Sequence, residues 1–110
     1  MTDLPDLATT FAALGDPVRR AIVERLAEGD ATVNELSRLF PITLQAVSRH
    51  IKVLEAGGVV TRRRDGKTRP VHLDAGSLAR SRDWLEGHRK RLERKYARLD
   101  DLLQQGDDRS

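Results

Sequence analysis

Four polar or cationic side chains lie at helical spacing between positions 45 and 52. Gln45 and Arg49 are four residues apart. Ser48 and Lys52 are also four residues apart, so all four side chains share one side of a helix. Arg can pair with guanine and Gln with adenine, whereas Ser and Lys can bond phosphates or base edges. Positions 43–54 contain no acid, which favours a nucleic-acid groove over an ordinary exposed helix with Glu–Lys pairs.

A second cationic segment follows and surrounds the pair Asp65-Gly66. Extended runs at 59–64 and 67–73 flank this pair, and Asp-Gly between two such runs is a strong signal for a β-hairpin. Five cations in eight residues repel one another unless an anion lies nearby, and DNA phosphate would supply that anion. Charge that protects an edge strand from aggregation is the alternative explanation. The cations are Arg62, Arg63, Arg64, Lys67 and Arg69.

The excess positive charge of the chain is confined to the same window. The chain has 110 residues, with 20 Lys and Arg against 17 Asp and Glu, for a formal net charge of +3. Residues 43–73 alone carry +5, whereas residues 1–42 carry −3 and residues 74–110 carry +1. A local basic patch on a nearly balanced protein favours a polyanionic partner. A solvated basic surface would explain the charge alone about equally well.

Short helices separated by Gly and Pro are predicted to position these side chains. Apolar residues recur at helical spacing in four segments, and Asp16, Thr32 and Thr43 each precede a segment as an N-cap. Glu35 completes a capping box with Thr32. The first four helices are therefore expected at residues 4–14, 17–28, 33–39 and 44–56.

The third and fourth of these segments form a helix-turn-helix pattern. Two short helices are joined by a tight turn at residues 40–42, where Pro41 disfavours helix in the residue before it. Val33, Leu36 and Leu39 are expected on one face of the third helix. In the fourth helix the residues at spacings of four and three are expected to face inward, and these are Val47, Ile51 and Leu54.

The last predicted helix runs from Gly76 to about Gln105 and is longer than a small domain needs. Leu78 begins a series of leucines that recur every seven residues, and a helix of this length spans roughly 45 Å. One apolar stripe on such a helix suggests a subunit seam, although a stripe that packs on its own domain is the alternative. We expect the start to pack on the domain and the rest to form a dimer with the first helix. The interface candidates are Leu4, Leu7, Phe11, Leu85, Leu92, Tyr96, Leu99 and Leu103.

Three sequence blocks together carry a resemblance to one family. They are Leu14–Arg20, Thr32–Leu36 and, most specifically, Gln45–Val60, and the hairpin segment Arg62–Leu73 continues them. On these residues the chain resembles the ArsR/SmtB family of winged helix-turn-helix transcriptional repressors. The resemblance covers about residues 8–75 by motif and the whole chain by helix order.

The resemblance implies both a fold and a function. The expected fold is mainly α with a small β-hairpin, in the order of four helices, two strands and a last helix. One domain would span residues 1–105, with a frayed tail at 106–110. The implied function is that of a cytoplasmic homodimer, joined through its first and last helices, which represses transcription from a partly palindromic double-stranded DNA operator.

The resemblance also implies roles for single residues. Gln45, Ser48 and Arg49 would face base edges, and His50 and Lys52 would lie near the DNA backbone. The wing, which is the hairpin Arg62–Leu73, would place its cations on flanking phosphates or in the minor groove. The residues expected on the recognition helix are Thr43, Gln45, Ser48, Arg49, His50 and Lys52.

Metal and thiol chemistry are not expected. The chain has no Cys, which excludes a disulfide or a Cys-ligated metal within it. Many members of the family that it resembles sense metals through cysteines in the segment that is 33–39 here, and others through Asp, His and Glu of the last helix. Asp83 and His88 are five residues apart and fit one helix face poorly, with no second His at ligand spacing. We therefore expect neither a metal nor a cofactor, as in the non-metal members of the family. The sequence does not identify a small-molecule inducer.

Other function classes are weaker. A non-specific architectural DNA-binding protein would share the charge pattern, and a protein-interaction module would use the last helix instead. An enzyme is not expected, because Ser48 lacks a general base and His50 points to another face of the helix. No apolar run approaches the roughly 20 residues that span a bilayer, and the N-terminus has acids where a secretory signal would be basic. We therefore expect a cytoplasmic protein without a membrane partner.

Overall fold

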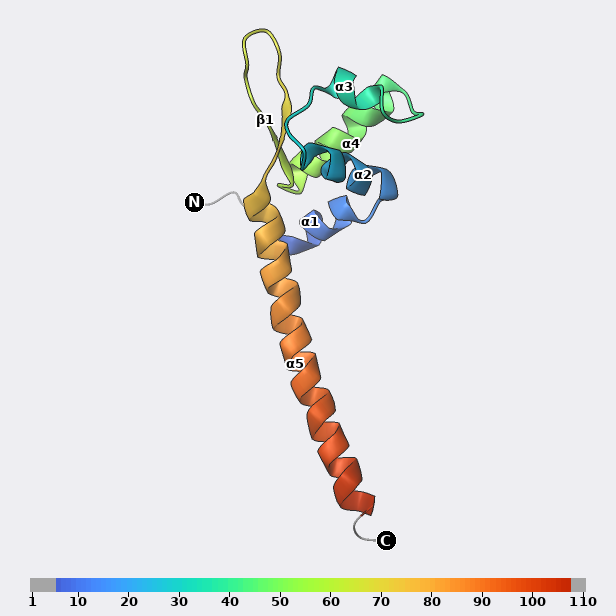
Figure 1. Ribbon diagram of the computed structural model, residues 1–110, viewed down its shortest axis with the longest axis vertical. Helices are drawn as coiled ribbons and strands as arrows, with labels where there is room; N and C mark the ends of the chain where they lie inside the picture. Colours follow the sequence, from blue (N-terminus) through green and yellow to red (C-terminus); the bar gives the residue numbers. More distant parts are fainter. Residues whose placement is uncertain (1–5, 108–110) are drawn as a thin grey trace. The chain divides into compact units, whose positions relative to one another are not determined.

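The computed structural model describes residues 6–107 and divides between residues 79 and 80 into two compact units. The first unit contains four helices, which are α1 (Leu7–Leu14), α2 (Pro17–Leu26), α3 (Val33–Ser37) and α4 (Leu44–Ala56). It also contains the strands β1 (Val60–Arg62) and β2 (Val71–Leu73). The last helix, α5 (Ala75–Asp107), begins in the first unit and forms the described part of the second. Figure 1 shows these elements in chain order.

Side-chain caps set the starts of the first four helices. The Asp16 and Thr43 side chains accept hydrogen bonds from the backbone N–H groups of Arg19 and Ala46, at 3.0 and 3.1 Å. The predicted capping box of α3 is also present. Asp6 caps α1, which begins at Leu7. The predicted interface residue Leu4 lies outside the described residues.

The prediction that Leu39 shares the buried face of the third helix was wrong. Helix α3 ends at Ser37, and the Leu39 side chain is 57% exposed. The N–H of Leu39 donates to the carbonyl of Leu36 at 3.0 Å, which is a tighter turn than an α-helix makes. This turn rotates Leu39 away from the core. Helix α2 likewise ends early, at Leu26, two residues before the predicted end.

The core of the first unit is built around the inner face of α4. Val47, Ile51 and Leu54 are fully buried there, as predicted. Each side chain of this size that leaves water stabilises the fold by about 1.5–3 kcal/mol. They pack with other buried residues from α1, α2, α3, the strands and their connections, namely Ala13, Ile22, Leu26, Ala31, Leu36, Val59, Val60 and Val71.

Helix α1 lies directly on the C-terminal end of α4. A Cβ atom at Gly57 would lie 3.0 Å from the Cβ of Ala13 and 3.1 Å from the carbonyl oxygen of Thr9. The buried hydroxyl of Thr10 donates to the Gly57 carbonyl at 2.7 Å. Only glycine permits this approach without displacing α1, so Gly57 has a packing role besides ending α4.

The predicted hairpin is present, but its turn lies one residue later than the Asp65-Gly66 pair. Strands β1 and β2 pair antiparallel, and an isolated bridge joins Asp65 to Thr68. The central turn residues are therefore Gly66 and Lys67. Gly66 has φ of +63°, as the first central residue of a type II′ turn requires. On its other edge, β2 exchanges two backbone hydrogen bonds with Ala31, through Val71.

Helix α5 is capped by Asp74, whose carboxylate accepts a hydrogen bond from the Gly76 N–H at 2.9 Å. It continues to Asp107, two residues beyond the predicted end, so the start of the predicted tail is helical. A single glycine such as Gly106 lowers helix stability by about 1 kcal/mol but keeps its N–H for the helical hydrogen bonds. Residues 108–110 lie outside the described range.

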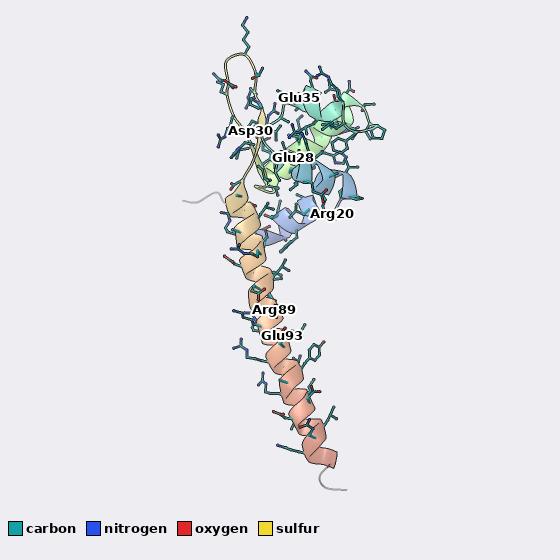
Figure 2. All side chains as sticks on the ribbon, in the orientation of Figure 1. Arg20, Glu28, Asp30, Glu35, Arg89 and Glu93 are labelled. Atoms are coloured by element: carbon teal, nitrogen blue, oxygen red, sulfur yellow. The ribbon has the colours of Figure 1, made fainter. Side chains whose placement is uncertain are left out.

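The second unit holds exposed apolar side chains beside ion pairs along one helix. Arg89 forms ion pairs with Glu86 and Glu93, three residues before it and four after it (Figure 2). The hydrogen bond from Arg89 holds the pKa of Glu86 below its ordinary value. The large apolar residues that lie exposed on this unit are Trp84, Leu85, Leu92, Tyr96, Leu99, Leu102 and Leu103.

Candidate nucleic-acid interface

The outer face of α4 brings four predicted side chains together. Gln45, Arg49 and Lys52 are exposed and Ser48 is half-buried. The four residues line one shallow depression of about 290 Å³. Because the opposite face of α4 is anchored in the core, this polar face is turned to solvent by the packing itself. The polar groups around the depression are an amide, a hydroxyl, a guanidinium and an ammonium group, and none of the four side chains is a carboxylate.

Thr43 and His50 have other partners. The hydroxyl of Thr43 is engaged as the N-cap of α4. His50 is half-buried, and its Nδ1 atom lies 3.3 Å from the guanidinium of Arg19 and 3.9 Å from the carboxylate of Asp16. Both of these belong to the start of α2. The structure therefore separates His50 from the four residues around the depression, and its predicted position near the DNA backbone stays a prediction.

Arg19 is a residue that sequence reasoning missed. Besides His50, its guanidinium donates to the carbonyls of Ala13 and Ala12, at 2.6 and 3.2 Å. Both carbonyls lie in the last turn of α1, where the Ala12 carbonyl also accepts a hydrogen bond from the N–H of Gly15 at 3.1 Å. Arg19 thus ties the end of α1 to the middle of α4. Its backbone N–H holds the pKa of the Asp16 cap below its ordinary value.

The five cations of the wing fall into two groups. Arg62 donates twice to the carbonyl of Arg69, at 3.0 and 2.8 Å, and Arg63 lies 2.9 Å from the Nε2 atom of His72. Both side chains are therefore held by the hairpin itself. Among the described residues, no side-chain hydrogen bond holds Arg64, Lys67 or Arg69. These three exposed cations can meet an anion without first giving up a side-chain hydrogen bond.

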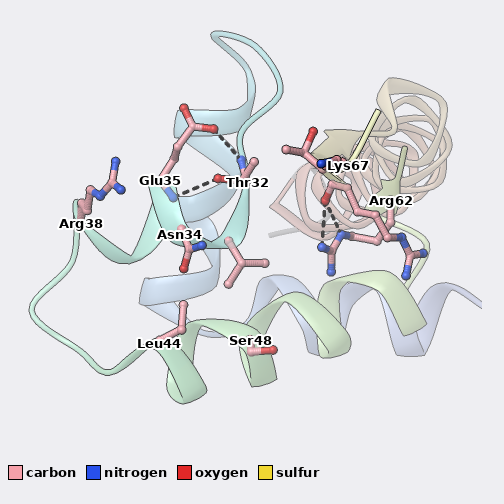
Figure 3. Close-up of a pocket in the computed structure, with 11 residues that line it drawn as sticks. Thr32, Asn34, Glu35, Arg38, Leu44, Ser48, Arg62 and Lys67 are labelled. Carbon is pink, nitrogen blue, oxygen red and sulfur yellow. Dashed lines mark hydrogen bonds between the residues drawn. The ribbon is translucent and has the colours of Figure 1, made fainter. Parts of the chain in front are cut away.

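A groove of about 560 Å³ runs between α3, the start of α4 and the wing (Figure 3). Arg62 and Lys67 line it from the wing, and Asn34 and Arg38 line it from α3. The contribution of Arg38, the C-cap of α3, was not predicted from the sequence, because Arg38 lies outside the basic window of residues 43–73. Four cations line the groove in total, and they are Arg38, Arg62, Lys67 and Arg69.

One carboxylate also lines this groove. The backbone N–H of Thr32 donates to Glu35 at 3.0 Å and holds the pKa of that carboxyl below its ordinary value. Glu35 in turn satisfies the start of α3, so its place is explained by the capping box (Figure 3). The groove keeps a positive balance in spite of this charge, as a polyanion strand would require.

The described residues 6–107 bear on metal binding and on membrane spans. Within that range no three His, Cys, Asp or Glu side chains gather as a metal site would need. His88 instead packs against Trp84, with ring centroids 4.0 Å apart. Over the same residues, no helix combines the length and the apolar character that crossing a bilayer demands.

The chain is similar to known helix-turn-helix proteins. Residues 14–63, which include α2, α3, α4 and β1, match a family model described as a helix-turn-helix domain. Over 104 residues the chain is 44% identical to the HTH-type transcriptional regulator Rv2034 of Mycobacterium tuberculosis (strain ATCC 25618 / H37Rv), covering 94% of both proteins. It is 31% identical over 75 residues to the transcriptional repressor SdpR of Bacillus subtilis (strain 168), covering 68% of this chain and 83% of SdpR.

Solved structures share the fold as well. The crystal structure of the ArsR family transcriptional regulator RHA00566 matches with a TM-score of 0.72 and 33% sequence identity. That match covers 79% of this chain and 96% of the solved chain. The similarity therefore extends well beyond the helix-turn-helix segment.

Proposed function

We propose that this chain, which belongs to the ArsR family of winged helix-turn-helix transcriptional regulators, acts as a homodimeric repressor on a partly palindromic DNA operator. The observation that carries the proposal is the outer face of α4, which carries no acid from residue 44 to residue 54. Gln45, Ser48, Arg49 and Lys52 meet there around one depression, while the other face is fixed in the core. An α-helix of this kind fits the major groove of B-DNA.

The contacts divide into two kinds. Arg49 and Gln45 carry the planar donor and acceptor groups that pair with guanine and adenine, so they would specify bases. Lys52 and the free wing cations Arg64 and Lys67 would neutralise phosphates and position the duplex without selecting sequence. The groove between α3 and the wing would hold one phosphate strand beside the base-reading face.

The dimer proposal rests on the apolar stripe of α5. Leu85, Leu92 and Leu99 recur every seven residues and each is about half exposed, at 52%, 49% and 46%. Tyr96 and Leu103 extend the same stripe. A heptad stripe of this kind is typical of a helix that packs against a second helix. We propose that a second copy of the chain covers it, with Leu7 and Phe11 of α1 contributing to the same interface.

Selection of bound sequences from a random pool of duplex DNA at fixed salt tests the whole proposal. A two-fold symmetric motif is the expected result. With three to five phosphate contacts per protomer, log K against log salt should have a slope of roughly −5 to −9. A selected pool without any motif would support a non-specific architectural protein instead, and a nearly flat salt dependence would contradict DNA binding altogether.

Two arginine variants separate the two kinds of contact. Arg49→Ala is expected to weaken operator binding by about 1–3 kcal/mol and to relax the preference at one base position. Arg64→Ala should weaken binding to all sequences similarly and lower the salt slope by about 1 per protomer. The same behaviour in both variants would contradict this division.

The regulator would act in the cytoplasm, where its operator lies.

A further inference from the structure

His72 connects the wing to the helix-turn-helix body through two charged side chains. Its Nδ1 atom lies 2.8 Å from the carboxylate of Asp30, in the loop after α2. Its Nε2 atom lies 2.9 Å from the guanidinium of Arg63, which follows β1. Figure 2 labels Asp30 beside the hairpin. Beside these three side chains, the backbone of Ala31 forms hydrogen bonds with the backbone of Val71 in β2. The wing is therefore attached to the loop after α2 by side-chain contacts and by backbone hydrogen bonds.

The two partners decide which ring nitrogen of His72 carries hydrogen. An ionised carboxylate only accepts hydrogen bonds, so Nδ1 must donate to Asp30. A guanidinium only donates, so Nε2 must accept from Arg63. Both bonds exist together only when the imidazole is neutral, with its hydrogen on Nδ1. A proton on Nε2 would place two donors face to face, and Arg63 would be released.

We propose that His72 takes up a proton when a DNA phosphate draws Arg63 away, so that DNA binding and protonation of the wing are coupled. The inference rests on the proposed function, because it needs the wing to meet phosphate. A phosphate oxygen is a stronger partner for a guanidinium than a neutral imidazole is, since that bond is charge-assisted on both sides. Once Arg63 turns to phosphate, Nε2 has lost its donor and is exposed to a negative field.

The surroundings of His72 favour the cation after this exchange. The charged groups placed against the imidazole are Asp30 from the loop and Arg63 after β1, and the cross-strand partner Thr61 is uncharged. Moving the guanidinium of Arg63 onto phosphate leaves the Asp30 carboxylate in contact with the ring, which favours the protonated form. The proton comes from solvent water and forms an N–H bond at Nε2. Asp30 and His72 are thus positioning residues for Arg63.

The coupling has a definite sign. Because the DNA-bound state would hold more protons, affinity for DNA should rise as pH falls and should be lost as pH rises. Imidazole groups change charge between about pH 5 and 8, so the effect should appear in that range. With one proton per protomer, the gain is at most about tenfold per pH unit for each protomer bound.

Binding of the full chain to a duplex of about 24 base pairs, a little over two turns of B-DNA, tests the coupling. The duplex has an arbitrary sequence, because phosphate contacts are independent of sequence, and low salt is kept constant. The dissociation constant is measured from about pH 8 to about pH 6 for the wild type and His72→Gln. We expect His72→Gln to bind with a pH dependence flatter than that of the wild type by up to about tenfold per pH unit. His88→Gln, a change of one histidine in the second unit, should keep the wild-type slope.

Two further measurements test the coupling between DNA binding and protonation of His72. Arg63→Gln leaves His72 on Asp30 but removes the exchange, so it should also flatten the pH dependence. The ring-proton NMR signals of His72 should show the neutral form in the free protein and the protonated form on the duplex at about pH 7. Binding with the same pH slope in the wild type, His72→Gln and Arg63→Gln would overturn the coupling. Absence of duplex binding at every pH would instead contradict the proposed function.

Discussion

The two units of the chain place the same kind of side chain in opposite environments. In the first unit, Ile51 and Leu54 of α4 are removed from water almost completely. In the second, Leu92 and Leu99 of α5 keep about half of their surface exposed. All four recur at helical spacing, so periodicity alone does not distinguish them. The core of the first unit is therefore complete within one chain, whereas the stripe of the second unit stays exposed in one chain and is open to the second copy proposed above.

The charged residues of the two units differ in the same way. In the first unit, the carboxylates of Asp16 and Glu35 accept hydrogen bonds from backbone N–H groups at helix starts. In the second unit, Glu86 and Glu93 serve a neighbouring Arg89 on the same helix. Helix α5 therefore carries local ion pairs between exposed side chains, and exposed pairs of this kind add little stability. These pairs leave the apolar stripe uncovered, in keeping with the proposed second copy of the chain.

A core substitution should cause the greatest loss of stability in the first unit. Ile51→Ala should lower the free energy of unfolding by about 2–5 kcal/mol, because it leaves a cavity in a fully packed core. Urea denaturation followed by circular dichroism measures this loss. Val53→Ala is the control on the same helix, where the side chain is 40% exposed, and should cost less than about 1 kcal/mol. Equal losses in both variants would mean that α4 is not anchored by its inner face.

A second substitution tests the apolar stripe of the other unit. Leu92→Glu should weaken self-association by about 30-fold or more, as expected when a charge enters a desolvated interface centre. Sedimentation velocity over a range of concentrations gives the dissociation constant. The first unit should unfold in urea as the wild type does.

Ala97→Glu is the matched control for that change. It adds the same charge to the same helix at an exposed position off the stripe, and it should leave self-association nearly unchanged. Equal weakening by both variants would assign the effect to charge alone, and no weakening by Leu92→Glu would remove the stripe from the dimer interface.

The weakest of these effects should be a change in how the first unit loses stability at low pH. The pKa of Asp16 is held below its ordinary value of 3.8 by the backbone N–H of Arg19, so the folded chain binds this proton less readily than the unfolded chain. The resulting stabilisation is present above the ordinary pKa and is lost as pH falls below it. Asp16→Asn should therefore show a slightly flatter loss of stability in acid, because Asn still caps the helix without titrating.

Thermal unfolding across an acid pH series measures this difference. Asp100→Asn removes one exposed carboxyl from the second unit and should keep the wild-type profile in the first unit. A steeper acid loss in Asp16→Asn than in the wild type would contradict the assigned role of the cap.

Local sequence signals accounted for most of the helices and for the polar outer face of α4. Thr43 as a cap and the spacing of Val47, Ile51 and Leu54 predicted the bounds of α4 and its buried side, because one helical turn fixes where each residue points. The polar face follows from the same geometry. The hairpin was also predictable, although pairing of β2 with both β1 and Ala31 placed its turn at Gly66-Lys67.

Contacts between distant residues were decided by the tertiary structure. His72 and Asp30 are 42 residues apart in the chain, and Arg19 and His50 are 31 apart. No periodic pattern relates such pairs, since their distance depends on how several helices and the hairpin pack at once. For the same reason, the sequence alone counted five equal wing cations, while the folded hairpin holds two of them and leaves three free. Patterns within one element are set by local geometry, but the partners of a side chain are set by packing.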